Sequence, residues 1–205
     1  MKHISTFFAS FLAPLLMCLS AAHAQSGWFW QNPIPQGNSL GAVTFSDGNT
    51  GTAVGYLGTI LRTTNGGATW TSQSSGTTND LLGVSFTDAN TGTAVGSSGT
   101  IRRTTNGGTT WTGQTSGTST QLSAVSFSDA NNGTAVGGGG TILTSQEGIA
   151  WISRIPMTDA ALGAIAYGNG RFVAVGGKYD PITGAPLAGT ILTSADAIEW
   201  DPLQQ

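Results

Sequence analysis

The chain has 205 residues, of which 31 are glycine; only 8% are charged and 39% are hydrophobic. Soluble domains usually carry about 25% charged residues. This composition therefore excludes a charge-driven disordered chain, a coiled coil and a basic nucleic-acid binder. The net charge of −3 gives no attraction to phosphate or anionic lipid, so we expect no nucleic-acid partner.

The first segment predicts an export signal rather than a part of the fold. Lys2 precedes an apolar run from Phe7 to Leu19, and Ala22-His23-Ala24 has the small-x-small pattern of a cleavage site. The run is short for a membrane span, and no later run approaches 18 apolar residues. We expect a signal peptide at 1–24, a periplasmic or secreted mature chain at 25–205, and no stable membrane insertion after cleavage.

Two alternatives remain for this segment. One is an uncleaved anchor, and the other is lipid attachment at Cys18, which Met17 disfavours because a lipoprotein signal carries a small residue there. Cleavage would remove Cys18 together with His3 and His23, which are all the cysteine and histidine of the chain. The mature chain would then have no disulfide, thiolate nucleophile, histidine base or zinc site, so we expect no metal and no cofactor.

The rest of the chain consists of four copies of one repeat unit, at about 38–74, 79–115, 120–155 and 160–205. Phe45, Phe86, Phe127 and Tyr167 are spaced 41, 41 and 40 residues apart. The tryptophans that follow are spaced 41, 40 and 49 residues apart, at Trp70, Trp111, Trp151 and Trp200. The last gap holds an insertion around 179–188. A fixed period of about 41 residues is typical of a repeat architecture.

Within the first repeat, the hydrophobic residues alternate with a period of two. Strands are predicted at 42–45, 51–55, 59–63 and 69–72, with turns at 46–49 and 57–58 and a hairpin at Asn65-Gly66-Gly67. The many Thr, Val and Ile residues suit a pleated sheet, and no capped apolar helix pattern occurs. Four strands per unit predict an all-β fold, a β-propeller built from four-stranded blades of about 41 residues.

The hairpin before each tryptophan resembles the Asp-box, the Ser/Thr-x-Asp-x-Gly-x-Thr-Trp motif of sialidase-type propellers. The copies at 63–70 and 104–111 match well, with Asn in place of Asp, and the copies at 144–151 and 193–200 are weaker. An Asn side chain can still cap the turn. The residues assigned to this structural motif are Thr63, Asn65, Gly67, Trp70, Thr104, Asn106, Gly108, Trp111, Thr144, Gly148, Trp151 and Trp200.

The wider pattern resembles the photosystem II assembly and stability factors, the Ycf48/Hcf136-like propellers. Residues 30–38 are similar to the entry segment of that family, and residues 49–55 and 58–64 to its blade core. The resemblance implies a seven-bladed propeller, whereas this chain has four repeats. A truncated member, a small propeller and one half of an assembly all remain open. Trp28-Phe29-Trp30 is expected to add a closing strand to the last blade.

The acidic residues predict structural turns rather than catalysis. Asp88 and Asp129 recur at one repeat position, after the first strand, and Asp47 is their near equivalent. Catalysis by paired carboxylates needs a unique pair on one face, which a residue repeated in every blade does not provide. We therefore predict turn capping by these residues and assign no catalytic residue.

Two features are candidates for binding a partner. Arg62 and Arg103 occupy the same position in adjacent blades and predict a small basic patch, with Arg102 pointing to the opposite side. Ordinary solvated arginines and a sialidase-like arginine triad are the alternatives, while the Ycf48 resemblance implies an arginine-bearing face that binds a partner. The insertion with Lys178 and Tyr179 is the second candidate, because unrepeated loops on a rigid scaffold often carry specificity.

These features predict a non-catalytic exported propeller that binds a protein partner. The resemblance implies a scaffold or an assembly and stability factor for an envelope or membrane complex. The alternative is a carbohydrate-binding or sialidase-like glycosidase propeller, because Asp-boxes are frequent in such proteins.

Overall fold

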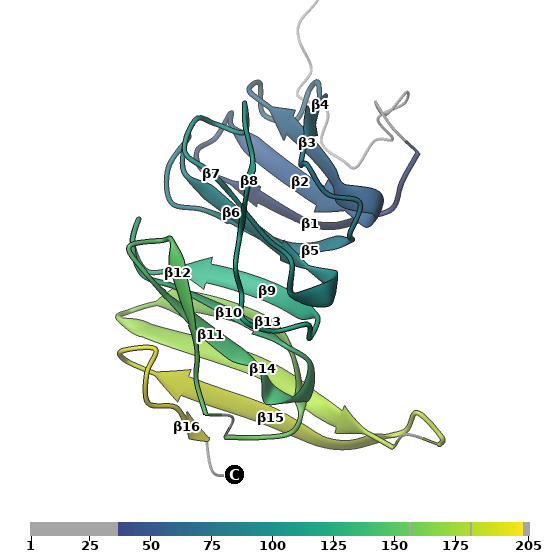
Figure 1. Cartoon of the computed structure of the whole chain (residues 1–205), viewed down its shortest axis with the longest axis vertical. Coiled ribbons are helices and arrows are strands. Elements are labelled where there is room, and N and C mark those ends of the chain that lie inside the picture. The colour runs from purple at the N-terminus through teal and green to yellow at the C-terminus, as the bar shows by residue number, and fades with distance from the viewer. Residues whose placement is uncertain (1–36, 156, 181, 203–205) are drawn as a thin grey trace, which may run out of the picture. The chain divides into compact units, whose positions relative to one another are not determined.

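The computed structural model describes residues 37–155, 157–180 and 182–202, and it arranges them as sixteen strands in four antiparallel sheets (Figure 1). The predicted signal peptide at 1–24 and the predicted closing segment Trp28-Phe29-Trp30 lie outside these residues. The expectation of an all-β fold with four propeller blades is confirmed. Within the described ranges, no helix is long and apolar enough to cross a membrane.

Each sheet is one blade, in which consecutive strands pair with one another. Blade 1 contains β1 (Leu40–Phe45), β2 (Gly51–Gly55), β3 (Thr59–Thr63) and β4 (Thr71–Ser74). Blade 2 contains β5 (Leu81–Phe86), β6 (Gly92–Gly96), β7 (Ile101–Thr104) and β8 (Thr112–Gln114). Blade 3 contains β9 (Leu122–Phe127), β10 (Gly133–Gly137), β11 (Ile142–Gln146) and β12 (Ala150–Ser153). Blade 4 contains β13 (Ala161–Gly168), β14 (Arg171–Tyr179), β15 (Pro186–Ser194) and β16 (Asp201–Pro202).

The second and third strands are joined differently in blade 4. In blades 1 to 3 a short 3-10 turn joins them, namely η1 (Tyr56–Gly58), η2 (Ser97–Gly99) and η3 (Gly138–Gly140). In blade 4 the insertion instead lengthens β14 and β15 into a longer hairpin, in which Tyr179 pairs with Pro186. The fourth strand of blade 1 also differs from the prediction and begins at Thr71, because the preceding turn extends through Thr69, whose N–H donates to Asn65 Oδ1 at 2.9 Å.

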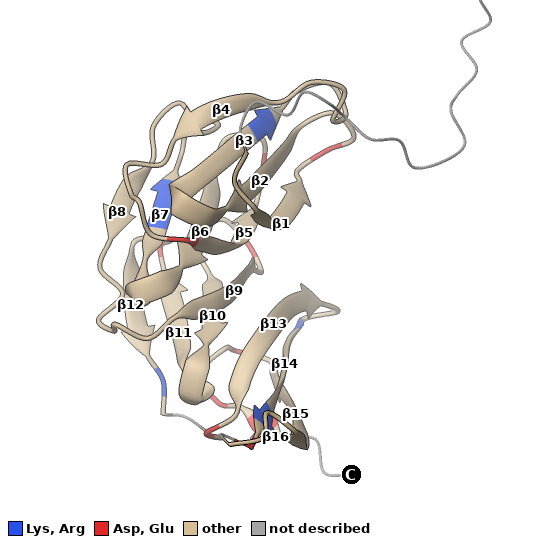
Figure 2. Ribbon diagram, turned by 90° about the vertical axis from the view of Figure 1, so that its right-hand side faces the viewer, with Lys and Arg blue, Asp and Glu red and all other residues tan. Residues whose placement is uncertain are grey.

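The blades follow one another in chain order through contacts between their first strands (Figure 2). β1 contacts β5, β5 contacts β9, and β9 contacts β13. We call the three contacts between consecutive blades seam 1 (blades 1 and 2), seam 2 (blades 2 and 3) and seam 3 (blades 3 and 4). The faces that meet in these three seams are therefore buried, as expected for a repeat protein.

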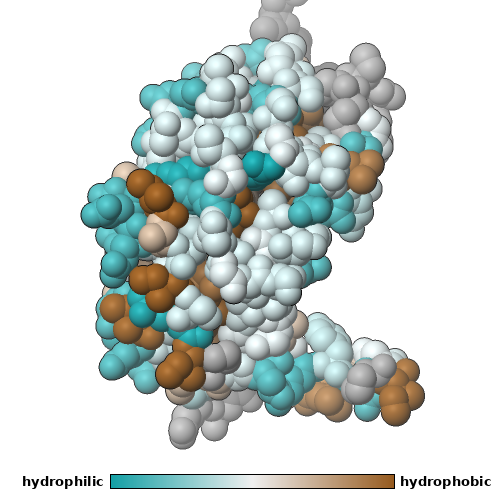
Figure 3. Space-filling model, viewed as in Figure 1, coloured by the Kyte–Doolittle hydropathy of each residue, from teal (hydrophilic) through white to brown (hydrophobic). Residues whose placement is uncertain are grey.

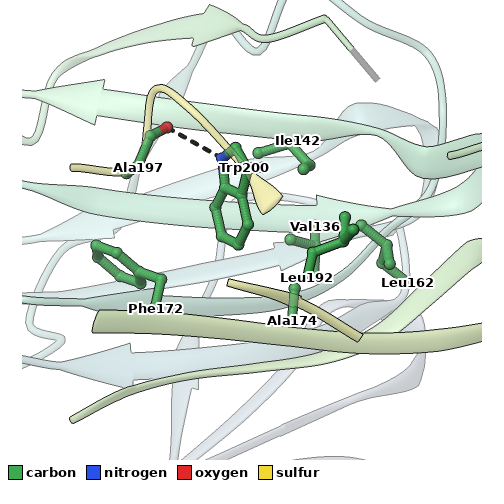
Figure 4. Close-up of a cluster of buried hydrophobic side chains, with 8 residues drawn as sticks. All are labelled: Val136, Ile142, Leu162, Phe172, Ala174, Leu192, Ala197 and Trp200. Carbon is green, nitrogen blue, oxygen red and sulfur yellow. Dashed lines mark hydrogen bonds between the residues drawn. The ribbon is translucent and has the colours of Figure 1, made fainter. Parts of the chain in front are cut away.

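One cluster of buried side chains fills each seam, and the three clusters use the same repeat positions. The earlier blade contributes a valine and an isoleucine from its second and third strands: Val54 and Ile60, Val95 and Ile101, or Val136 and Ile142. The later blade contributes a leucine and a tryptophan: Leu81 and Trp111, Leu122 and Trp151, or Leu162 and Trp200. Figure 4 shows the cluster of seam 3. Full burial of each such aliphatic side chain contributes about 1.5–3 kcal/mol.

An aromatic ring on the first strand of blades 1 to 3 lies over a glycine on the second strand. Phe86, for example, pairs with Gly92, where a Cβ atom would lie 2.4 Å from the Phe86 ring. Blade 4 departs from this arrangement, because Phe172 pairs with Tyr167 and their ring centres lie 4.8 Å apart. Blade 4 therefore differs from the first three blades by one extra aromatic ring at this end of its first two strands.

Candidate functional site

The acidic residues that recur in the repeats cap turns, as predicted. In Asp47, Asp88 and Asp129, one carboxylate oxygen accepts hydrogen bonds of 2.6–3.0 Å from the backbone N–H groups two and three residues further on. The backbone bonds lower the pKa of Asp47 and Asp88 below the usual 3.8. The pKa of Asp129 is lowered chiefly by the Asn132 side-chain amide. These carboxylates are thus held ionised by the turns that they stabilise.

These turns predict a loss of stability in acid. A carboxyl group whose folded pKa is depressed contributes stability above its unfolded pKa, and this contribution is lost as the pH falls through the folded pKa. We expect the melting temperature to fall below about pH 4, and the triple variant Asp47→Asn, Asp88→Asn and Asp129→Asn to show a shallower fall. Thermal unfolding from about pH 7 to pH 2 tests this. An unchanged slope in the triple variant would contradict it.

The two well-matched Asp-boxes are closed hydrogen-bonded turns. Thr63 Oγ1 donates to Asn65 Oδ1 at 2.9 Å and accepts the Gly67 N–H at 2.9 Å. Blade 2 repeats these contacts at 3.0 and 2.9 Å, with Thr104, Asn106 and Gly108. The asparagine thus performs the capping that the sequence predicts for it. The motif tryptophans Trp111, Trp151 and Trp200 are buried, while Trp70 is partly exposed.

The repeated arginines lie in seams 1 and 2. Arg103 Nη2 donates to the Ala130 carbonyl of the next blade at 3.2 Å, and its guanidinium carbon lies 5.9 Å from the centre of the Phe127 ring. Arg62 makes the equivalent contacts one seam earlier, with Ala89 and Phe86. Partial burial lowers the pKa of both guanidinium groups below the usual value for arginine. Both arginines therefore join blades, whether or not they also bind a partner.

Arg102 points away from Arg103, toward the preceding blade, as the strand alternation predicts. Its guanidinium donates to the carbonyl of Gly76, which lies in the link between blades 1 and 2. The structure thus brings Arg62 and Arg103 to equivalent places and separates Arg102 from them. A role of these three arginines in binding a partner stays a prediction.

Reversing the charge of Arg103 is expected to destabilise the fold. Arg103→Glu removes the hydrogen bonds to Thr93 and Ala130 and the contact with the Phe127 ring, and it places a second acid near Asp88. Loss of the cation–π contact and of these two hydrogen bonds costs about 1–3 kcal/mol together. Urea unfolding measures the loss, with Arg171→Glu on exposed β14 as the control. Equal stability of both variants would contradict a role for Arg103 in seam 2.

Two glutamines complete seams 1 and 2, and the sequence analysis did not single them out. Gln114 Nε2 donates to the Gly148 carbonyl at 2.8 Å, and Gln114 Oε1 accepts the Trp151 Nε1–H at 2.8 Å. Gln73 makes the same pair of contacts one seam earlier, with Gly107 and Trp111. The sequence does hold a signal for these glutamines, because each stands three residues after a repeat tryptophan.

The insertion in blade 4 carries exposed apolar side chains. Tyr179 is 63% exposed, Ile182 93% and Leu187 62%, and Figure 3 shows hydrophobic side chains at the tip of this hairpin. Lys178 forms an ion pair with Asp159, and its hydrogen bond lowers the pKa of that carboxyl below the usual 3.8. Lys178 and Tyr179 thus lie on a protruding hairpin away from the arginines, and partner binding by them also stays a prediction.

Seam 3 departs from the other two seams at both polar positions. The assignment of Thr144 to the Asp-box is wrong, because the turn of blade 3 is one residue shorter and Thr144 pairs with Thr134, at the position that Arg62 and Arg103 hold in blades 1 and 2. Ser145 takes the place of the motif threonine, and Arg154 stands where blades 1 and 2 have Gln73 and Gln114. Arg154 Nε donates to Thr144 Oγ1 at 2.7 Å. Among the described residues no glutamine bonds to Trp200, whose Nε1–H donates to the Ala197 carbonyl of its own blade at 3.2 Å.

A cleft opens in seam 3 where the arginine is replaced. Its walls come from both blades and include Thr144, Ser145, Arg154, Tyr167 and Asp196. Ser145 is only 3% exposed, and its hydroxyl has no hydrogen-bond partner, because blade 3 lacks the asparagine that accepts this bond in blades 1 and 2. A buried hydroxyl without a partner is costly, so seam 3 leaves a polar group unsatisfied at the wall of this cleft.

An exposed apolar patch lies beside Arg154, on β12, on the link that follows it and in the turns that precede β12 and β16. Ile149, Ile152, Ile155, Met157 and Ile198 are 42–85% exposed, and we call them the outer apolar patch. Figure 3 shows hydrophobic side chains gathered where β12 and β16 lie. Where blade 3 has Ile149, Ile152, Ile155 and Met157, blade 2 has Thr109, Thr112, Thr115 and Gly117. The patch is therefore specific to blades 3 and 4, and exposed apolar patches are typical of interaction surfaces.

Comparisons with known proteins agree with this architecture. Residues 73–165 match a family model described as photosynthesis system II assembly factor YCF48. These residues, which include all of blade 2 and all of blade 3, are thus similar to that family. A structure of YCF48 bound to D1 peptide superposes with a TM-score of 0.65 at 18% identity, covering 84% of this chain and 55% of that one. YCF48 from Cyanidioschyzon merolae superposes with a TM-score of 0.63 at 20% identity, covering 83% of this chain and 57% of that one.

The chain spans little more than half the length of those structures. It also superposes on an ancestral GH74 enzyme, with a TM-score of 0.62 at 19% identity, covering 80% of this chain and 25% of the enzyme. At this identity the likeness concerns the fold alone. No curated protein matches the chain by sequence.

The described part of the chain gathers no three His, Cys, Asp or Glu side chains that could hold a metal ion. Its candidate functional site is the seam 3 cleft together with the outer apolar patch, and Arg154 lines both. Sequence reasoning missed this site because it looked for residues that recur. Aligning the four repeats position by position would have found it, since blade 3 replaces Thr by Ile at 152 and 155.

Proposed function

We propose that this chain is a non-catalytic, exported β-propeller that binds a segment of a protein partner at blades 3 and 4. The observation that carries the proposal is the combination at one site of five exposed apolar side chains, the Arg154 guanidinium and the unpartnered Ser145 hydroxyl. Apolar anchors beside a few polar groups are typical of protein-binding surfaces. The likeness to YCF48 bound to D1 peptide supports a polypeptide as the ligand.

The proposed role is assembly or stabilisation of an envelope or membrane complex. The match of residues 73–165 to an assembly-factor family supports this role, and the sequence pattern of residues 1–24 supports export. A rigid stack of blades suits the task, because it presents a fixed surface without ordering costs on binding. The partner would extend over the outer apolar patch and place polar groups in the cleft.

Crosslinking capture from the exported fraction of the host tests the proposal. The chain serves as bait, and mass spectrometry identifies both the captured protein and the crosslinked residues. We expect one dominant envelope protein, crosslinked near Arg154, and its loss from the double variant Ile152→Thr and Ile155→Thr. That variant restores residues that blade 2 already carries at Thr112 and Thr115, so the fold is expected to persist.

A matched control is Ile182→Ser at the tip of the blade 4 hairpin. Ile182 is 93% exposed but lies on the hairpin between the second and third strands, whereas the cleft is walled by the turns after the first and third strands. Capture that survives the double Thr variant but not Ile182→Ser would move the binding site to the hairpin. Absence of any captured protein would contradict the proposal.

Carbohydrate recognition is the second candidate, and the structural likeness to GH74 enzymes favours it. A glycan array and a fluorogenic sialoside test it directly on the purified chain. Hydrolysis that is abolished by replacing a single unrepeated acid, such as Asp196→Asn, would establish a glycosidase and overturn the non-catalytic proposal.

A further inference from the structure

Blade 1 exposes a face that every other blade buries. Leu40 is 46% exposed, whereas the equivalent leucines of blades 2 to 4, Leu81, Leu122 and Leu162, are all 0% exposed. Val43 and Phe45 on the same strand are 59% and 47% exposed. In seams 1 to 3 this face receives the preceding blade, and blade 1 has no preceding blade among the described residues.

Blade 4 exposes the opposite face. Val175 and Ile191 are each 40% exposed. The equivalent residues of blades 1 to 3 are 0–2% exposed: Val54, Val95 and Val136, and Ile60, Ile101 and Ile142. In each seam this valine and isoleucine pack against the next blade. The free face of blade 4 and the free face of blade 1 are thus the two halves of one further seam.

The backbone also permits this further seam. In seam 2 the first strands approach so closely that a Cβ atom at Gly83 would lie 2.8 Å from the Cα atom of Ala124. The corresponding positions at the free faces, Ala42 and Ala164, are also small. Seam 3 shows that a seam forms without the arginine of seams 1 and 2, so Thr193 at that position of blade 4 is no obstacle.

We propose that a second copy of this chain occupies both free faces. Blade 4 of each copy docks on blade 1 of the other, so that two head-to-tail seams close a ring of eight blades. A head-to-tail contact either closes into a ring or grows into a filament. The chain covers 55% and 57% of the YCF48 chains on which it superposes, so two copies supply about one ring of such blades. A second copy carries both complementary faces and satisfies them at once.

Analytical ultracentrifugation of the purified full chain gives the first test. We expect twice the protomer mass for the wild type and one protomer mass for both Val43→Asp and Val175→Asp, with the β-sheet circular dichroism spectrum retained. An equimolar mixture of the two variants keeps one intact seam, so it is expected to form a heterodimer that neither variant forms alone. A monomeric wild type would overturn the proposal, as would a Val175→Asp variant that remains dimeric.

A cysteine pair gives the second test and identifies the seam. The double variant Gly41→Cys and Ala164→Cys places one cysteine on each side of the proposed seam. In seam 2 the equivalent positions are Ser123 and Gly83, and a Cβ atom at Gly83 would lie 3.0 Å from the backbone carbonyl oxygen of Ser123. The chain's own cysteine, Cys18, lies in the predicted signal peptide. Oxidation of the double variant should give a disulfide-linked dimer on a non-reducing gel. A linkage within one protomer would show that the chain closes alone and would overturn the proposal.

Discussion

Replacing Gly99 by alanine is expected to lower the free energy of unfolding by about 3 kcal/mol. Gly99 ends the turn η2 with a φ of 65°, in the left-handed region that an alanine adopts at a cost of about 1–2 kcal/mol. A Cβ atom there would also lie 1.9 Å from the Thr118 carbonyl oxygen. That carbonyl belongs to the link into blade 3, so the strain falls on backbone and no side-chain rotation relieves it.

A neighbouring glycine separates the two parts of this cost. Gly117 has a φ of 72°, and no heavy atom lies within 4 Å of its added Cβ position. Gly117→Ala is therefore expected to lower the free energy of unfolding by only the cost of the left-handed backbone conformation, about 1–2 kcal/mol. Urea unfolding of both variants measures the difference. Equal losses would show that the close approach of η2 to the link is not a constraint on the fold.

The blades were predictable from the sequence because the strand patterns and turn residues that form them are local and recur in several repeats. The second strand has the sequence Gly-Thr-Ala-Val-Gly in blades 1 to 3, and all five residues are buried in each. The aspartate turns were predictable for the same reason, since a carboxylate binds N–H groups only two or three residues away. Repetition thus converted short-range rules into a prediction of the whole architecture.

The role of the arginines was not predictable in the same way. The strand pattern placed Arg62 and Arg103 on one side and Arg102 on the other, and the structure confirms this. The strand pattern could not predict which residues of the next blade contact each arginine. Whether an arginine is solvated or covered depends on how closely the next blade approaches, and that distance is set by buried residues far away in the chain. The cleft of seam 3 was hidden for the same reason.

Replacing a tryptophan in a seam is expected to cause the second large loss of stability. Trp151→Ala is expected to lower the free energy of unfolding by about 3–5 kcal/mol, because it leaves a cavity in seam 2. Trp151 is 8% exposed, packs edge-on against Phe127 with ring centres 6.1 Å apart, and donates to Gln114 at 2.8 Å. Trp151→Phe keeps much of the packing and loses this hydrogen bond, so it is expected to cost less than the alanine variant.

A double-mutant cycle with Gln114 assigns the hydrogen-bonded part. We expect Gln114→Ala to cost about 1 kcal/mol less in the Trp151→Phe background than in the wild type, because the bond between the two side chains is then already absent. Chemical denaturation of the four proteins supplies the cycle. Strictly additive costs would mean that the glutamine acts only through its bond to the Gly148 carbonyl, and the tryptophan would then hold seam 2 by packing alone.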